Sequence, residues 1–149
     1  MLEAIKAMIA NASQRKFEDS DYRLAAAALL VHVAEADGRV VEAERIRMRG
    51  LLVARFGLDE AASADLLRAA AQSDHEAADF STFTATLNRA LNDDERRKIV
   101  EMLWEVAFAD GELHEFEDSA IWRIAELLGI SQSSLPEIYK RGPAKRADT

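Results

Sequence analysis

The chain has 149 residues, a formal net charge of −8 and no cysteine. This length favours one domain, the acidic balance argues against a nucleic-acid-binding face, and the lack of cysteine excludes disulfides, thiol nucleophiles and zinc–thiolate sites. No apolar run approaches the roughly 18 residues of a transmembrane helix, and the N-terminus lacks a signal-peptide pattern, so we expect a cytoplasmic protein.

Apolar residues recur at spacings of three and four throughout, and no convincing stretch alternates apolar and polar residues, which predicts an all-α fold. Residues 1–149 should form one helical bundle of about seven to eight helices. The first expected helix covers about residues 2–12, and the second begins at Asp19, Ser20 or Asp21 and runs to Asp37. The others cover about residues 42–56, 60–72, 81–91, 93–110, 115–128 and 131–140. Residues 73–79 read as a polar loop and residues 140–149 as a flexible tail.

Local signals set several of these boundaries. Asp59 and Ser81 are expected to cap the helices that follow them, since both residue types accept a hydrogen bond from the first turn. Gly57 and Gly129 are expected to end helices, because glycine readily adopts the left-handed conformation that follows a helix C-terminus.

Two helices are apolar on nearly every side, YRLAAAALLVHVAEA (residues 22–36) and IVEMLWEVAFA (residues 99–109). A helix of this kind lies at the centre of a protein, so we expect a central buried helix pair. The one-sided helices at residues 42–56, 60–72 and 115–128 should pack around it. Four aromatic residues have core-type spacings and are expected to pack rather than to form a binding box: Trp104, Phe108, Phe116 and Trp122.

The chain contains an internal repeat. HVAEADGRVVEAER (residues 32–45) returns 73 positions later as EVAFADGELHEFED (residues 105–118). The repeat halves cover about residues 20–58 and 93–130. Each half reads as a helical hairpin, made of a buried helix, a tight Asp-Gly turn and an amphipathic helix. The two hairpins are expected to pair their buried helices with approximate two-fold symmetry.

Six carboxylates recur at the two turns: Asp37, Glu42, Glu44, Asp110, Glu115 and Glu117. One interpretation is structural, because glutamates in the first turn of a helix can complete a capping box and favour the helix dipole. That interpretation explains the two aspartates less well, since they face the negative end of a dipole. The other interpretation is a site for a hard divalent cation with oxygen ligands, such as Ca²⁺, Mg²⁺ or Mn²⁺.

Other polar residues are also candidates for a functional site. His32 aligns with Glu105 in the repeat and could meet it across the central pair, although a satisfied core histidine explains it as well. Glu101 and Glu105 lie four apart and could do acid–base work, but we find no nucleophile, phosphate loop or oxyanion donor and expect no enzyme. Arg45 and Arg49 share a face that is either solvated or bound to a partner.

The doubled Ala-Asp-Gly turn followed by two spaced glutamates resembles the TerB-like tellurite-resistance family, over about residues 20–130. The resemblance implies an all-helical bacterial cytoplasmic protein with two related halves, linked to stress response and to metal binding through the six carboxylates. The chain departs from the family motif at Val41 and His114, where Ser or Thr is common. His114 could itself join a metal site. Tellurium chemistry is not implied, because the chain has no soft thiolate.

The sequence is consistent with two functions. One is a non-catalytic, stress-associated, TerB-like module that binds a divalent metal ion at its acidic turns. The other is a protein–protein interaction module in which the turns are structural, and a protein partner is expected.

Overall fold

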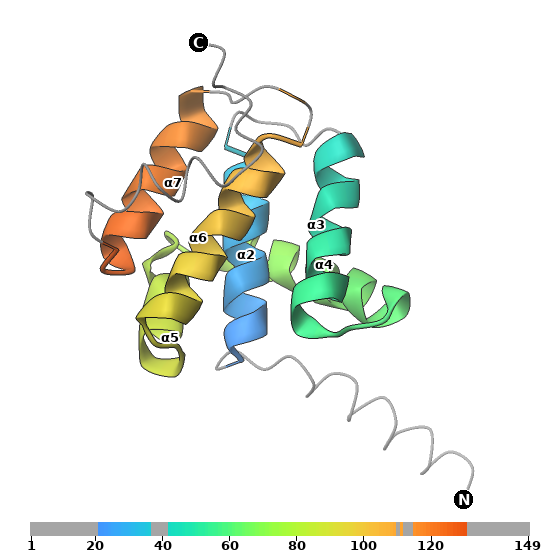
Figure 1. Ribbon diagram of the computed structural model, residues 1–149, viewed down its shortest axis with the longest axis horizontal. Helices are drawn as coiled ribbons and strands as arrows, with labels where there is room; N and C mark the ends of the chain where they lie inside the picture. The colour runs from blue at the N-terminus through green and yellow to red at the C-terminus, as the bar shows by residue number, and fades with distance from the viewer. Residues whose placement is uncertain (1–20, 37–41, 110, 112–114, 131–149) are drawn as a thin grey trace, which may run out of the picture.

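The computed structural model describes residues 21–36, 42–109, 111 and 115–130. Within these ranges the chain forms six helices and no strand, which confirms the all-α fold (Figure 1). The other two expected helices, about residues 2–12 and 131–140, lie outside the described residues. The six helices are α2 (Tyr22–Ala34), α3 (Glu42–Phe56), α4 (Glu60–Glu76), α5 (Ser81–Ala90), α6 (Asp93–Ala107) and α7 (Glu115–Leu127).

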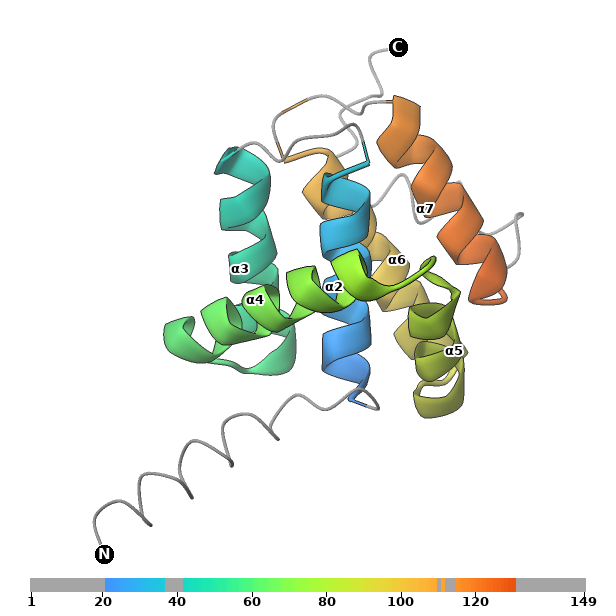
Figure 2. The ribbon, with the colours of Figure 1, turned by 180° about the vertical axis from the view of Figure 1, so that it is seen from behind.

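Helix α2 is the centre of the bundle, as predicted. Every residue from Leu24 to Val31 is buried, and α2 packs against α4, α5, α6 and α7. Figures 1 and 2 show α2 and α6 side by side, with α3 on one side of them and α7 on the other. A fully buried leucine contributes about 1.5–3 kcal/mol to folding, so the leucines of α2 anchor the neighbouring helices.

Trp104 of α6 packs in the core, as its spacing predicted. Its side chain is fully buried, and its ring meets that of Trp122 edge-on with the centroids 6.4 Å apart. The prediction for Phe116 is wrong, because this side chain is 65% exposed. The buried stripe of α7 contains Glu117, Ile121 and Ile124, and Phe116 is turned away from that stripe by roughly a quarter to a third of a turn.

Helices α2 and α6 both end three residues before their predicted ends. Helix α2 ends at Ala34 and α6 at Ala107. The backbone N–H of Ala36 bonds the carbonyl three residues back at 3.1 Å, and Ala109 does the same at 3.0 Å. The chain tightens at the equivalent place in both repeats, and such i→i−3 bonds commonly close a helix.

Helix α4 is longer than predicted, because it continues through residues 73–76 instead of ending at residue 72. The sequence SDHE is polar and reads locally as a loop. Asp74 contacts His32 of α2 and His75 contacts Glu35, the residue that follows α2, and these contacts stabilise the last turn of the helix. Tertiary contacts therefore override the local signal at this point.

The predicted caps differ in outcome. Asp59 caps α4 as expected, accepting a 2.7 Å hydrogen bond from the N–H of Ala62. Ser81 does not cap α5, because Phe80 occupies the N-cap position without a side-chain bond. Ser81 is the first helical residue, and its N–H donates to the carboxylate of Asp79 at 2.8 Å. Asp79 therefore accepts a hydrogen bond at the start of α5, the role that was expected of Ser81.

Candidate functional site

Three of the six predicted carboxylates can be placed. Glu42 is exposed at the first residue of α3. Glu44 and Glu117, which the repeat makes equivalent, are buried in the first turns of α3 and α7, with exposures of 2% and 0%. Burying a carboxylate is costly unless it is paired or hydrogen-bonded, and each of these two has an interaction partner. The equivalent glutamates are therefore part of the interior at the ends of the two turns.

The other three carboxylates cannot be placed. Asp37, Asp110 and the side chain of Glu115 lie outside the described residues, as does His114. In the ranges that are described, no three acidic or histidine side chains gather closely enough to hold a metal ion. The metal site at the two turns therefore stays a prediction.

His32 contacts a residue other than the one suggested by the repeat. Its Nδ1 lies 3.0 Å from Oδ1 of Asp74, and its ring packs on that of Phe80 with the centroids 5.0 Å apart. The hydrogen bond to Asp74 raises the pKa of His32, against the opposing effect of burial. Glu105 instead binds Arg55, with Oε2 3.2 Å from Nη2. His32 and Glu105 thus belong to two separate pairs.

A second histidine–carboxylate pair lies beside the first. Nε2 of His75 is 3.2 Å from Oε1 of Glu35, so α4 contributes an acid to one pair and a histidine to the other. Both pairs join the C-terminal end of α2 to that of α4. No pattern in the sequence predicts these pairs, because the partners are 40 or more residues apart and no motif relates them.

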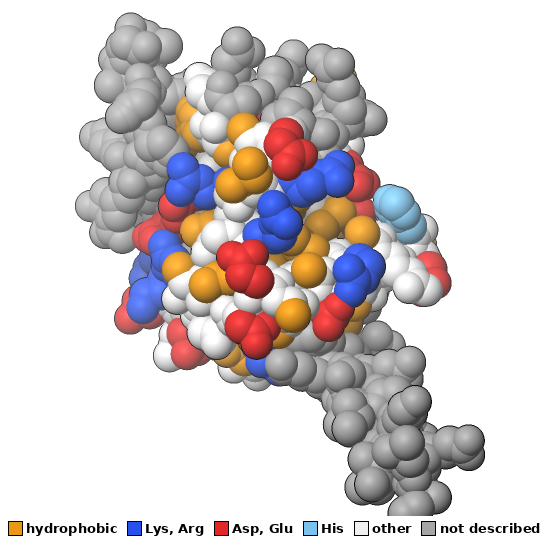
Figure 3. Space-filling model, turned by 90° about the vertical axis from the view of Figure 1, so that its right-hand side faces the viewer, with side chains coloured by type: hydrophobic (Ala, Val, Ile, Leu, Met, Phe, Trp, Pro, Cys, Tyr) orange, Lys and Arg blue, Asp and Glu red, His pale blue; other side chains and the backbone are white. Residues whose placement is uncertain are grey.

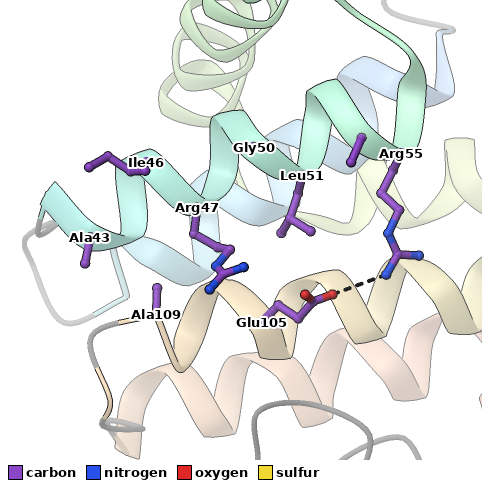
Figure 4. A pocket seen from close by; sticks show the side chains of 9 residues that line it. Ala43, Ile46, Arg47, Gly50, Leu51, Arg55, Glu105 and Ala109 are labelled. Atoms are coloured by element: carbon purple, nitrogen blue, oxygen red, sulfur yellow. Dashed lines mark hydrogen bonds and ion pairs between the residues drawn. The ribbon is translucent and has the colours of Figure 1, made fainter.

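An open groove runs between α3 and α6 (Figure 4). Its volume is about 620 Å³. The Arg55–Glu105 ion pair crosses it near one end, and Arg47 projects from α3 towards α6. Because Glu105 is held by Arg55, the arrangement does not favour the acid–base pair considered for residues 101 and 105. The groove is lined by Ala43, Ile46, Arg47, Gly50, Leu51, Ala54, Arg55, Glu105 and Ala109.

A smaller groove of about 280 Å³ lies on the other side of α3, towards α4. Val31, Met48 and Leu67 contribute apolar side chains to it, and Arg45 and Arg49 come from α3. Figure 3 shows this side of the molecule, where apolar side chains are interspersed with basic and acidic ones. Helix α3 is therefore flanked by two grooves, and Arg45 and Arg49 line the one on the side of α4.

Comparisons with known proteins agree with the TerB resemblance found in the sequence. The family model described as tellurite resistance protein TerB matches residues 23–139. The co-chaperone protein DjlA of Haemophilus influenzae is 31% identical over 129 residues, which covers 82% of this chain and 43% of that protein. The chain thus spans less than half the length of this curated relative. No solved structure matches the chain.

Proposed function

Because this chain belongs to the TerB family, we propose that it works as a non-catalytic protein-interaction module, with a partner protein docking over α3. The similarity to a co-chaperone supports this choice, since a co-chaperone by its name works together with another protein. That similarity covers less than half of the relative, so the role proposed here is that of a module. We also propose a cytoplasmic location and a link to stress response, as the TerB resemblance implies.

The exposed outer face of α3 carries the proposal. Ile46 is 55% exposed and borders the groove of about 620 Å³ between α3 and α6. A single exposed isoleucine is ordinary on a protein surface. An exposed isoleucine at the edge of an open groove with small neighbours is different, because a partner side chain can enter the groove while the isoleucine is covered. Interfaces combine such an apolar centre with a polar rim.

The test compares two surface variants in a capture experiment. Wild type, Ile46→Asp and Leu127→Asp are each immobilised and exposed at low salt to an extract of the protein's own cells. The proteins that bind to each are identified by mass spectrometry. Leu127 is the matched control, being 41% exposed and located on α7, across the central helices from α3. We expect Ile46→Asp to lose the captured partner and Leu127→Asp to retain it. Equal retention by both variants, with circular dichroism showing both folded, would rule out docking over α3.

Divalent-cation binding at the two Asp-Gly turns is the second candidate function. One observation favours it: Glu44 and Glu117 bring a carboxylate into the interior at the same place in each repeat. A cation at each turn would take the buried glutamate and the aspartate of that turn as ligands, Glu44 with Asp37 and Glu117 with Asp110. Ca²⁺, Mg²⁺ and Mn²⁺ are the candidates, because they prefer oxygen ligands.

Thermal unfolding tests the cation site. Protein stripped with EDTA is melted with and without each cation, alongside the Asp37→Ala/Asp110→Ala double variant. A cation at a hundred times its Kd should add about 2.7 kcal/mol of stability, a rise in Tm of several degrees. The rise should vanish in the double variant. Unchanged melting of wild type with all three cations would make the repeated turn purely architectural.

A further inference from the structure

The outer face of α3 has a defined pattern of side chains. Met48, Leu51 and Leu52 face the core and are buried. On the opposite side, small and apolar residues follow one another at spacings of three and four, and all are exposed: Ala43, Ile46, Gly50 and Ala54. This spacing keeps the four residues in one stripe along the helix. We call these four residues the α3 crest.

Arginines flank the crest. Arg47 lies on the side of α6, and Arg45 and Arg49 lie on the side of α4. In the part of the chain that the structure describes, none of these three lies within ion-pair distance of a carboxylate. Five other arginines do pair with carboxylates, although the protein has eight more acids than bases: Arg23, Arg55, Arg68, Arg96 and Arg97.

Like charges four residues apart on a helix repel each other, as Arg45 and Arg49 do. The three arginines thus form a local basic rim on an acidic protein. Carboxylates of a partner would relieve the repulsion and form charge-assisted hydrogen bonds with the guanidinium groups. Nucleic acid fits the rim poorly, because the net charge of −8 repels a phosphate backbone.

Gly50 gives a second, independent reason to expect a close neighbour. It lies in the middle of α3 and is exposed. A Cβ added at Gly50 would meet nothing within 4 Å, and among the glycines that the structure describes, those with positive φ are Gly57, Gly111 and Gly129. Glycine weakens a helix relative to alanine, and the described structure neither crowds this position nor strains it. A backbone that approaches α3 closely would require a residue without a side chain here.

We propose that the α3 crest receives an acidic amphipathic helix of a partner protein, which lies along α3 with its apolar side on Ile46 and Gly50. Its carboxylates pair with Arg45, Arg47 and Arg49. The inference rests on the proposed function and adds the chemistry of the partner. A helix fits better than a strand, because the crest follows the helical period and the described residues offer no sheet edge. Small residues at the crossing allow two helix axes to approach to about 8 Å.

Photo-crosslinking at the crest identifies the occupant. Benzoylphenylalanine replaces Ile46 in the full chain, and the crosslinked segment in an extract of its own cells is sequenced by mass spectrometry. We expect a segment with net negative charge and apolar residues at spacings of three and four. A neutral or basic segment, a second copy of this chain or a lipid would overturn the inference.

The identified segment is then synthesised, and its affinity is measured by fluorescence anisotropy. The Arg47→Glu/Arg49→Glu variant should weaken binding at least tenfold, with a strong dependence on salt. Gly50→Ala should weaken it roughly tenfold, because the added methyl group occupies the contact. Arg123→Glu, an exposed position on α7, should leave the affinity unchanged. Because Gly50→Ala should not destabilise the free chain, weaker binding by this variant cannot be ascribed to unfolding.

The outcomes separate this inference from the proposed function. A segment that crosslinks at Ile46 but binds without helix formation, or without sensitivity to charge reversal, overturns the acidic helix and leaves docking over α3 standing. A partner that is captured by the chain but never crosslinks at Ile46 overturns both.

Discussion

Gly50 and Gly57 have different backbone conformations, and alanine substitutions at the two positions test the structure of α3. Gly50 has helical backbone in the middle of α3, whereas Gly57 follows the last turn with φ of +66°. A Cβ added at either residue would meet nothing within 4 Å. The two alanine substitutions therefore differ in backbone conformation and not in steric crowding.

Gly50→Ala should raise the free energy of unfolding by about 0.5–1 kcal/mol, because alanine restricts the unfolded chain and favours the helix. Gly57→Ala should lower it by about 1 kcal/mol, because an L-residue is strained in the left-handed region. For a domain of this size, 1 kcal/mol corresponds to a shift in Tm of about 2–4 °C. The two variants should thus melt on opposite sides of wild type.

Urea unfolding followed by far-UV circular dichroism gives both free energies. Equal m-values would show that the variants alter the stability of the folded state without changing the surface exposed on unfolding. If Gly50→Ala destabilised the chain as much as Gly57→Ala, Gly50 would not lie in open, helical surroundings. The use of Gly50 to infer a close-packed partner would then fail.

Three further predictions concern the core, a cap and a pH-dependent pair. Trp104→Ala should cost about 3–5 kcal/mol, because the indole is fully buried; a loss below about 1 kcal/mol in chemical denaturation would contradict the described core. Asn92→Ala should cost about 1 kcal/mol, because it breaks a reciprocal capping box with Glu95, both bonds being 2.9 Å; an unchanged Tm would contradict the cap. The pKa of His32 is raised by Asp74, and Glu35 also favours the charged form. The charged ring therefore stabilises the fold fully below the ordinary histidine pKa of about 6.5, and this stabilisation is lost as the pH rises through the raised pKa. The stability difference between wild type and His32→Gln should therefore shrink from about pH 5.5 to pH 8.5, and a difference independent of pH would refute the pair.

The sequence alone was sufficient for several features whose cause lies within a few residues along the chain, although not for the cap of α5. The bounds of α3 were predicted to the residue, because helical periodicity begins at Glu42 and Gly57 ends it. The burial of α2 followed from a segment with apolar residues on every side. The positive φ of Gly129, 74°, agrees with its predicted role after α7. Helical periodicity and glycine conformations depend on neighbouring residues in the chain, so they can be predicted without knowledge of tertiary contacts.

Tertiary structure decided what depends on how helices cross. Nothing near SDHE in the sequence predicts a helical last turn for α4, which forms where Asp74 meets His32. The orientation of Phe116 depended on which stripe of α7 faces the core. The groove between α3 and α6 depends on the crossing of two helices that are far apart in the sequence, and so does the exposure of its arginines. The sequence places six carboxylates at or near the two Asp-Gly motifs. Only the three-dimensional arrangement of the helices determines that two of them, Glu44 and Glu117, are buried.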